Sequence, residues 1–152
     1  MTSRALVWRR LDVPGMEITH VESLERAAGT QIGVAYELRW LLEGRRLELE
    51  VVGGPSTTLE LEDADFFDVL ASPFFNSLPV VRDGLLDGGS ARTYTMRFVQ
   101  VPSLEVVPSE QRYEPLGGRT VRYSSGTFAA NIEFDADGFV TMYEGFLERV
   151  EE

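Results

Sequence analysis

The sequence predicts an all-β protein with little helix, and three observations support this fold class. Apolar and polar residues alternate with a period of two along most of the 152 residues, as in strands with one buried face. Turn-forming residues interrupt the alternation at close intervals, which divides the chain into about ten to twelve short strands. Segments with helical spacing are rare. This pattern is typical of a roll, a barrel or a sandwich.

The first 62 residues contain four alternating segments. Met16–Val21 comes first, and Gln31–Leu42 is expected to form one strand. Arg46–Val52 follows at once, so the intervening Glu43-Gly44 is expected to make a tight hairpin between the two. Thr57–Glu62 resumes the alternation after a Gly-Gly-Pro break.

The middle of the chain is harder to assign. Asp63–Ala71 fits both a short helix and a strand, and the strand is favoured. Pro73 and Pro79 come next, and they bias the preceding Ser72 and Leu78 towards extended conformations. We therefore expect an irregular corner that holds bulky apolar groups in a set orientation, with no long helix after it.

The β-pattern returns from Arg92 onward. Arg92–Gln100 alternates along its length, and Leu104–Val107, between two prolines, is expected to be a short edge segment. Alternating Phe128–Phe134 is followed by Asp137-Gly138 and then by Phe139–Tyr143. An Asp-Gly pair between two alternating runs is a strong hairpin signal. Because no repeat or linker divides the chain, residues 1–152 are expected to form a single domain.

Composition limits the partners that the protein can have. The net charge is −11, and all 14 basic residues are arginines. Without lysine, neither Schiff-base chemistry nor a phosphate-loop lysine is available. Nucleic acids and anionic membranes are expected to be repelled by the acidic surface. Cysteine is absent, which excludes disulfides and thiolate sites.

The chain carries no apolar run long enough for a signal peptide or a membrane-spanning helix, so a cytoplasmic location without membrane insertion is expected. His20 is the only histidine, and in its alternating strand it is expected to be half-exposed. A serine–histidine–carboxylate arrangement and a zinc site are therefore not expected. Asp135 and Asp137 are interpreted as turn residues, because position twelve of a calcium loop would be Phe146. We expect no metal, no cofactor and no identifiable catalytic residue.

Arginines within the alternating pattern are candidates for function. Arg10, Arg97 and Arg112 each lie in such a segment, and an inward guanidinium requires a partner. One interpretation is an ion pair with Asp12 or another carboxylate. The other is that an arginine and Asn76 point into a cavity and hold a polar ligand group.

Five segments in order carry a resemblance to a known family. They are Trp8–Gly15, Ser72–Pro79, Val101–Leu104, Pro108–Tyr113 and Asp135–Gly138. Their order and spacing resemble the bacterial family called putative glycolipid-binding proteins, over most of the chain. The resemblance implies a spiral β-roll, which is an antiparallel, barrel-like curled sheet. It also implies a binding function, and it supplies no catalytic residues.

The leading hypothesis is a non-catalytic protein that binds a glycolipid-like amphiphile in a cavity beside Asn76. The candidate ligand-binding residues are Trp8, Arg10, Phe74, Asn76, Arg97, Arg112 and Tyr113. One alternative is an interaction module without a small ligand, which forms a homodimer through an edge strand such as Leu104–Val107. The other is a hydrolase that uses paired carboxylates as acid and base.

Overall fold

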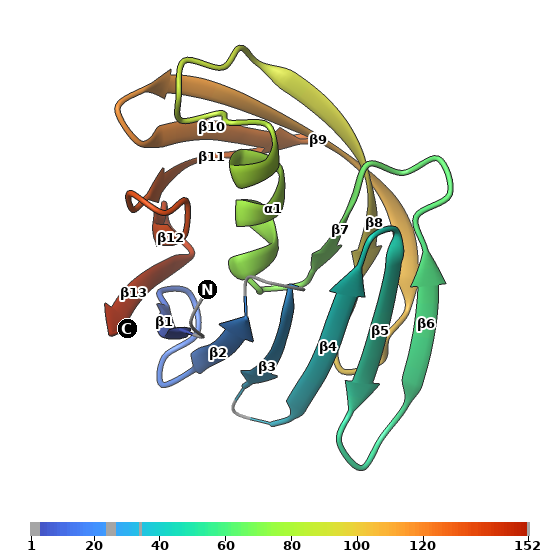
Figure 1. The fold of residues 1–152 in the computed structure, drawn as a ribbon. Helices are drawn as coiled ribbons and strands as arrows, with labels where there is room; N and C mark the ends of the chain where they lie inside the picture. The colour runs from blue at the N-terminus through green and yellow to red at the C-terminus, as the bar shows by residue number, and fades with distance from the viewer. Residues whose placement is uncertain (1–3, 24–26, 34, 152) are drawn as a thin grey trace.

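The computed structural model describes residues 4–23, 27–33 and 35–151, which form one curled sheet and one helix (Figure 1). The helix α1 spans Phe74–Arg82. The strands are β1 Arg4–Arg10, β2 Glu17–Ser23, β3 Ala28–Ile32, β4 Glu37–Glu43, β5 Arg46–Val51, β6 Ser56–Glu60, β7 Phe66–Val69, β8 Arg92–Val99, β9 Val106–Gly117, β10 Thr120–Ser125, β11 Phe128–Phe134, β12 Val140–Tyr143 and β13 Leu147–Glu151. The predicted all-β, curled-sheet fold class is confirmed.

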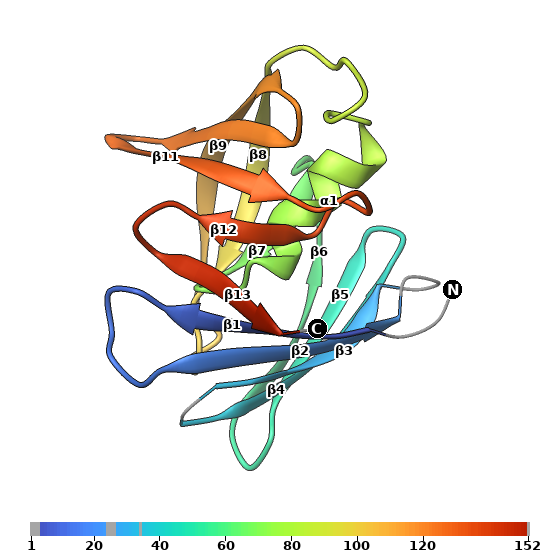
Figure 2. The ribbon, with the colours of Figure 1, turned by 90° about the vertical axis from the view of Figure 1, so that its left-hand side faces the viewer.

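The sheet consists of two meanders that meet at the ends of the chain. Its strand order is β6-β5-β4-β3-β2-β1-β13-β12-β11-β10-β9-β8-β7. Neighbours are antiparallel except β7 and β8, which are parallel. Strand β1 pairs with β13, and Figure 2 shows β12, β13, β1 and β2 side by side. The edge strands β6 and β7 are not paired with each other, so the sheet curls without closing.

Period-two alternation explains most of the strands. Along β5, Leu47, Leu49 and Val51 are buried while the residues between them are exposed. The expected hairpin after Glu43 is present, with Glu43 opposite Arg46. Gln31–Leu42, however, is not one strand. The chain turns after Ile32, and its two parts belong to β3 and β4, which pair with each other.

The expectation of an edge strand at Leu104–Val107 is wrong. Leu104 lies in a turn with a φ of 63°, and Val106 begins the long strand β9. Strand β9 lies between β8 and β10, so both of its edges are hydrogen-bonded within the sheet. The prolines at its start limit the pairing locally without moving the strand to an edge.

The proline-framed corner is a helix, which corrects the expectation of extended backbone there. Pro73 occupies the N-cap of α1 with φ −64° and ψ −20°, where a proline removes no intrahelical bond. Pro79 lies inside the helix, and Leu78 before it is helical. Burial compensates for this weak local preference, since Phe74, Phe75 and Val80 are almost completely buried.

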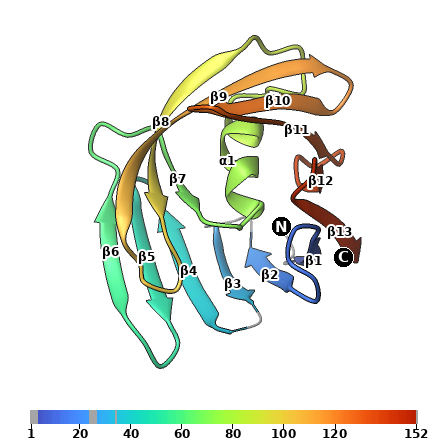
Figure 3. The same ribbon diagram turned by 180° about the vertical axis from the view of Figure 1, so that it is seen from behind.

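The helix lies within the curve of the sheet, on its concave side (Figures 1 and 3). Its first turn packs into an aromatic cluster, with the Phe74 ring 4.6 Å from the Trp40 ring and 5.8 Å from the His20 imidazole. Trp8 closes the cluster, and its indole N–H donates to the Val140 carbonyl at 2.9 Å. His20 is therefore fully buried. The prediction of half-exposure is wrong because α1 covers its face of the sheet.

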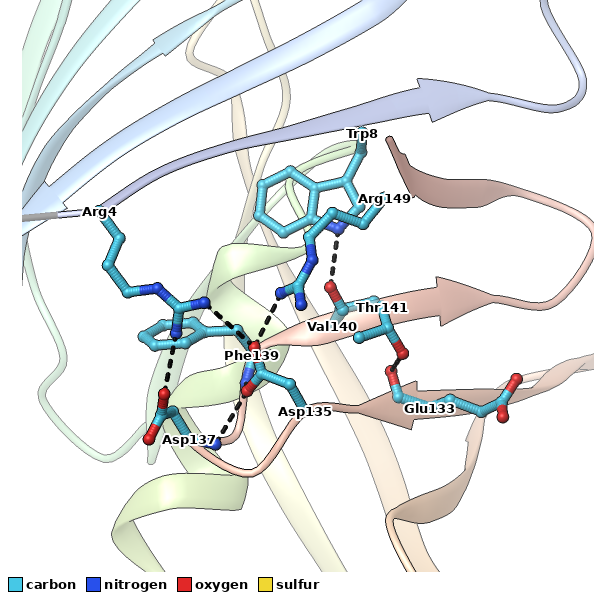
Figure 4. A network of polar contacts seen from close by, with 9 residues as sticks. All are labelled: Arg4, Trp8, Glu133, Asp135, Asp137, Phe139, Val140, Thr141 and Arg149. Atoms are coloured by element: carbon cyan, nitrogen blue, oxygen red, sulfur yellow. Dashed lines mark hydrogen bonds and ion pairs between the residues drawn. The ribbon is translucent and has the colours of Figure 1, made fainter. Parts of the chain in front are cut away.

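Ion pairs connect the two meanders where β1 and β13 meet (Figure 4). Asp135 accepts hydrogen bonds from Arg149 at 2.8 Å and from Arg4 at 3.3 Å. Its other oxygen accepts the backbone N–H groups of Asp137 and Phe139, which closes the β11–β12 turn. The interpretation of these aspartates as turn residues is confirmed. One carboxylate thus joins β1, β13 and this turn.

Candidate functional site

A cavity of about 530 Å³ lies at the N-terminal end of α1, between the β7–α1 connection and the β12–β13 turn. Strands β8 to β11 provide its remaining wall. It is lined by Asp12, Asp68, Val69, Leu70, Ala71, Ser72, Pro73, Asn76, Phe98, Ser109, Gln111, Tyr123, Ser125, Phe128, Tyr143, Glu144, Gly145, Phe146 and Leu147. This volume is within the range of small-molecule sites.

Five aromatic residues line the cavity, and we call them the aromatic wall: Phe98, Tyr123, Phe128, Tyr143 and Phe146. Four of these rings are in contact, with centroid distances of 6.0 Å between Tyr123 and Phe128 and 5.2 Å between Tyr143 and Phe146. Phe128 is 49% exposed. An exposed aromatic ring at the mouth of a cavity is available for a ligand to cover.

Four buried polar residues also line the cavity, and we call them the polar floor: Asp68, Ser72, Asn76 and Gln111. Gln111 Nε2 donates to Asp68 Oδ2 at 2.8 Å, and Gln111 Oε1 accepts from Tyr113 Oη at 3.3 Å. Asn76 Nδ2 donates to the same tyrosine oxygen at 3.0 Å. Helix α1 and strands β7 and β9 are thus connected by side-chain hydrogen bonds.

Burial raises the pKa of Asp68 to about 6, and the hydrogen bond from Gln111 opposes this effect. Burial, followed by the nearby Asp68 charge, also raises the pKa of Tyr113. The tyrosine is therefore a neutral hydrogen-bond donor at physiological pH, while the aspartate is mostly ionised. A buried carboxylate beside a cavity is a group that a ligand can reach and that the fold does not use as an ion pair.

Ser72 connects the floor to the core. Its Oγ lies 2.8 Å from His20 Nε2, which is the spacing of a nucleophile and a general base. Burial, however, lowers the pKa of His20 to about 3, and the Gln31 side chain opposes the effect only in part. An imidazole with so low a pKa is a weak base. The pair is better suited to orienting the serine hydroxyl than to activating it.

Three of the seven predicted ligand residues lie at or near this cavity. Asn76 lines it, so the cavity expected beside this residue is present. Tyr113 is fully buried behind the floor and is hydrogen-bonded to Asn76. Arg10 lies at the rim, where it makes two 2.7 Å hydrogen bonds to Asp12 and stacks over the Phe146 ring. The predicted ion pair between Arg10 and Asp12 is confirmed.

The other four predicted residues lie elsewhere. Trp8 and Phe74 belong to the aromatic cluster of the core. Arg97 is within 4 Å of two carboxylates near the β6–β7 connection, and Arg112 pairs with Glu114 on the outer face of β9. None of these four lines the cavity. A ligand contact for them remains a prediction.

The sequence reasoning missed most of the polar floor and the aromatic wall. Gln111 could have been found, because it alternates with Arg112 and shares a face with the buried Tyr113. Asp68 gives no such signal, since all four residues of β7 are buried. Within the described ranges, no helix is long and apolar enough to cross a membrane.

Comparisons with known proteins identify the family and a protein with a similar fold. The model of the family described as "putative glycolipid-binding" matches residues 39–149, which include α1 and most of the cavity lining. A DUF1089 family protein from Pseudomonas aeruginosa, known from a crystal structure, shares the fold with a TM-score of 0.59 and 20% identity, over 99% of this chain and 93% of that chain. A search of curated proteins found no match. Since the family model matches well over half of the chain, this protein belongs to the "putative glycolipid-binding" family.

Proposed function

We propose that this protein binds glycolipid-like amphiphiles in the cavity at the N-terminal end of α1, without catalysing a reaction on them. The observation that supports this function best is the pairing of an aromatic wall with a buried polar floor in one cavity. The apolar part of the ligand packs on the wall, and its polar head reaches the floor. The description of the family is consistent with this assignment.

The aromatic wall and the polar floor make different contributions to binding. Phe128 is half-exposed and Phe146 partly buried, so a ligand chain laid against them removes apolar area from water. Asn76 and Asp68 are each at least 94% buried, so the hydrogen bonds that they make with a head group form in a low dielectric. Orientation of the ligand therefore comes from the floor and most of the affinity from the wall.

Binding of n-octyl β-D-glucoside below its micelle concentration tests the proposal, with titration calorimetry as the measurement. Phe128→Ser should weaken the affinity about thirty-fold, because about 100 Å² of apolar contact at the mouth is worth ~2 kcal/mol. Leu116→Ser is the matched control, since Leu116 is 52% exposed and does not line the cavity. The proposal fails if the glucoside does not bind, or if the two variants lose affinity equally.

A further inference from the structure

The hydrogen bonds of the polar floor run in one direction and end on a carboxylate. Asn76 donates to Tyr113, Tyr113 donates to Gln111, and Gln111 donates to Asp68. The Tyr113 proton, one N–H of Asn76 and one N–H of Gln111 are therefore used within the protein, and an ionised carboxylate at the end of the chain can only accept. The side of Asp68 that faces the cavity offers lone pairs rather than protons.

The neighbouring His20 makes the Ser72 hydroxyl a hydrogen-bond acceptor towards the cavity as well. His20 Nδ1 and Gln31 Oε1 are both buried without a hydrogen-bond partner of standard geometry, and they belong to residues paired directly across β2 and β3. A proton on Nδ1 gives each of them a partner, and Gln31 Nε2 already donates to Tyr36 Oη at 2.9 Å. The Nδ1–H tautomer leaves Nε2 as an acceptor, so the Ser72 hydroxyl donates to it and presents only lone pairs to the cavity.

The charges around the cavity favour the same kind of ligand. Three carboxylates line it, those of Asp12, Asp68 and Glu144, and no arginine is among its lining residues. Arg10 neutralises Asp12, and Arg122 lies 3.9 Å from Glu144. Asp68 is held by the Gln111 amide and makes no ion pair within the described part of the chain. The deepest charge in the cavity is therefore an uncompensated anion.

We propose that the polar floor selects amphiphiles whose head group donates hydrogen bonds, such as a sugar hydroxyl or an ammonium, and rejects phosphate, sulfate and carboxylate heads. This inference rests on the proposed binding function and narrows its ligand class. A head group with N–H or O–H donors can form hydrogen bonds to the acceptor oxygens of Asp68 and Ser72. An anionic head would bring a second negative charge to a buried carboxylate and find no guanidinium there to pair with it.

Three probes with the same octyl chain test the selection at pH 8: octyl glucoside, octylammonium and octyl phosphate. Calorimetry should show that the glucoside and the ammonium bind at least tenfold more tightly than the phosphate. Octyl phosphate binding as tightly as either donor probe overturns this inference alone. If none of the three binds, the proposed function fails as well, so the two failures are distinguishable.

Asp68→Asn probes the deepest acceptor. Octylammonium should lose at least tenfold in affinity, and the difference between the glucoside and the phosphate should shrink. Asp63→Asn removes a carboxylate whose side chain is 92% exposed and lies outside the cavity, so it should leave all three affinities within twofold. Equal effects of the two variants on octylammonium would mean that the preference arises from net charge and would overturn the role of the floor.

The tautomer can be measured separately. Because His20 is the only histidine, its ¹⁵N and ¹H resonances can be assigned without a variant. A long-range ¹H–¹⁵N correlation spectrum should show the proton on Nδ1. An Nε2–H tautomer, with the Gln31 amide turned over, would free the Ser72 hydroxyl to donate into the cavity and would contradict an acceptor floor.

Discussion

The first turn of α1 serves two very different environments. Phe74 and Phe75 enter a core in which rings are in direct contact, with the Phe75 ring 5.0 Å from that of Trp40. Asn76, the next residue, belongs to a hydrogen-bonded network beside a cavity of about 530 Å³. The comparison teaches that one short helix both stabilises the fold and builds the site. Variants on its two sides should therefore separate stability from binding.

Phe74→Ala should have the largest effect, and on stability rather than on binding. The side chain is 1% exposed and contacts several rings, so its truncation should lower the free energy of unfolding by about 4 kcal/mol. Urea denaturation measures this loss. Under conditions where the variant is folded, octyl glucoside should bind as it does to the unaltered protein. A tenfold weaker affinity would instead place Phe74 at the ligand.

Asp68→Asn should increase the stability of the protein. The folded protein holds this carboxyl at a pKa of about 6, against 3.8 without burial, so folding favours its protonated form. Its contribution to stability therefore increases as pH falls from above 6 towards 4, and at pH 8 the buried charge costs about 3 kcal/mol. Urea unfolding at pH 8 should show the asparagine variant to be more stable by up to ~3 kcal/mol.

Because of His20, the stability of the Asp68→Asn variant should depend on pH differently from that of the unaltered protein. Its pKa is lowered from 6.5 to about 3 on folding, so its contribution to stability is lost as pH falls below 6.5. In the unaltered protein the Asp68 and His20 effects oppose each other between about pH 6 and 4. In the Asp68→Asn variant only the histidine effect remains, and stability should fall steeply over that range. A variant that loses no stability between pH 6 and 4 would contradict the assignment.

Asp135→Asn should cost less, about 2 kcal/mol. Burial raises the pKa of Asp135, but hydrogen bonds from the Phe139 backbone and from Arg149 outweigh it and leave the pKa below its usual value. Removing the charge weakens bonds that connect β1, β13 and the β11–β12 turn (Figure 4). Asp137→Asn is the control, since that side chain is 68% exposed and its loss should cost less than 0.5 kcal/mol. Thermal unfolding of both variants measures the two losses, and equal losses would contradict the role given to Asp135.

The strands could be predicted because their signal is local. Alternation in Arg46–Val51 needs no knowledge of the partner strand, and the Asp137-Gly138 turn is specified by two residues. The helix could not be predicted, since two prolines act against it locally and only the burial of Phe74 and Phe75 within the curled sheet compensates.

The site was harder to predict for a related reason. Asn76 was found from its unusual setting between bulky apolar residues, and the cavity does lie beside it. Asp68, Ser72 and Gln111 come from β7, a connection and β9, and the curling of the sheet is what brings them together. Whether His20 is exposed or buried also depends on which element covers its face. Period-two patterning predicts which face of the strand a residue lies on, but it does not predict which element packs against that face.

Tyr113→Phe should have the smallest effect on stability and the most informative one on the comparison. Loss of the hydroxyl leaves an Asn76 N–H and the Gln111 oxygen without this partner, which should cost about 1 kcal/mol by urea denaturation. Tyr143→Phe is the matched control on the aromatic wall, because no hydrogen bond joins its hydroxyl to the described residues, and it should change stability by less than 0.5 kcal/mol. If the floor orients the head group, only Tyr113→Phe should weaken octyl glucoside binding by several-fold, since Asn76 is no longer held. Equal losses from the two variants would show that the hydrogen-bonded floor does not position the ligand.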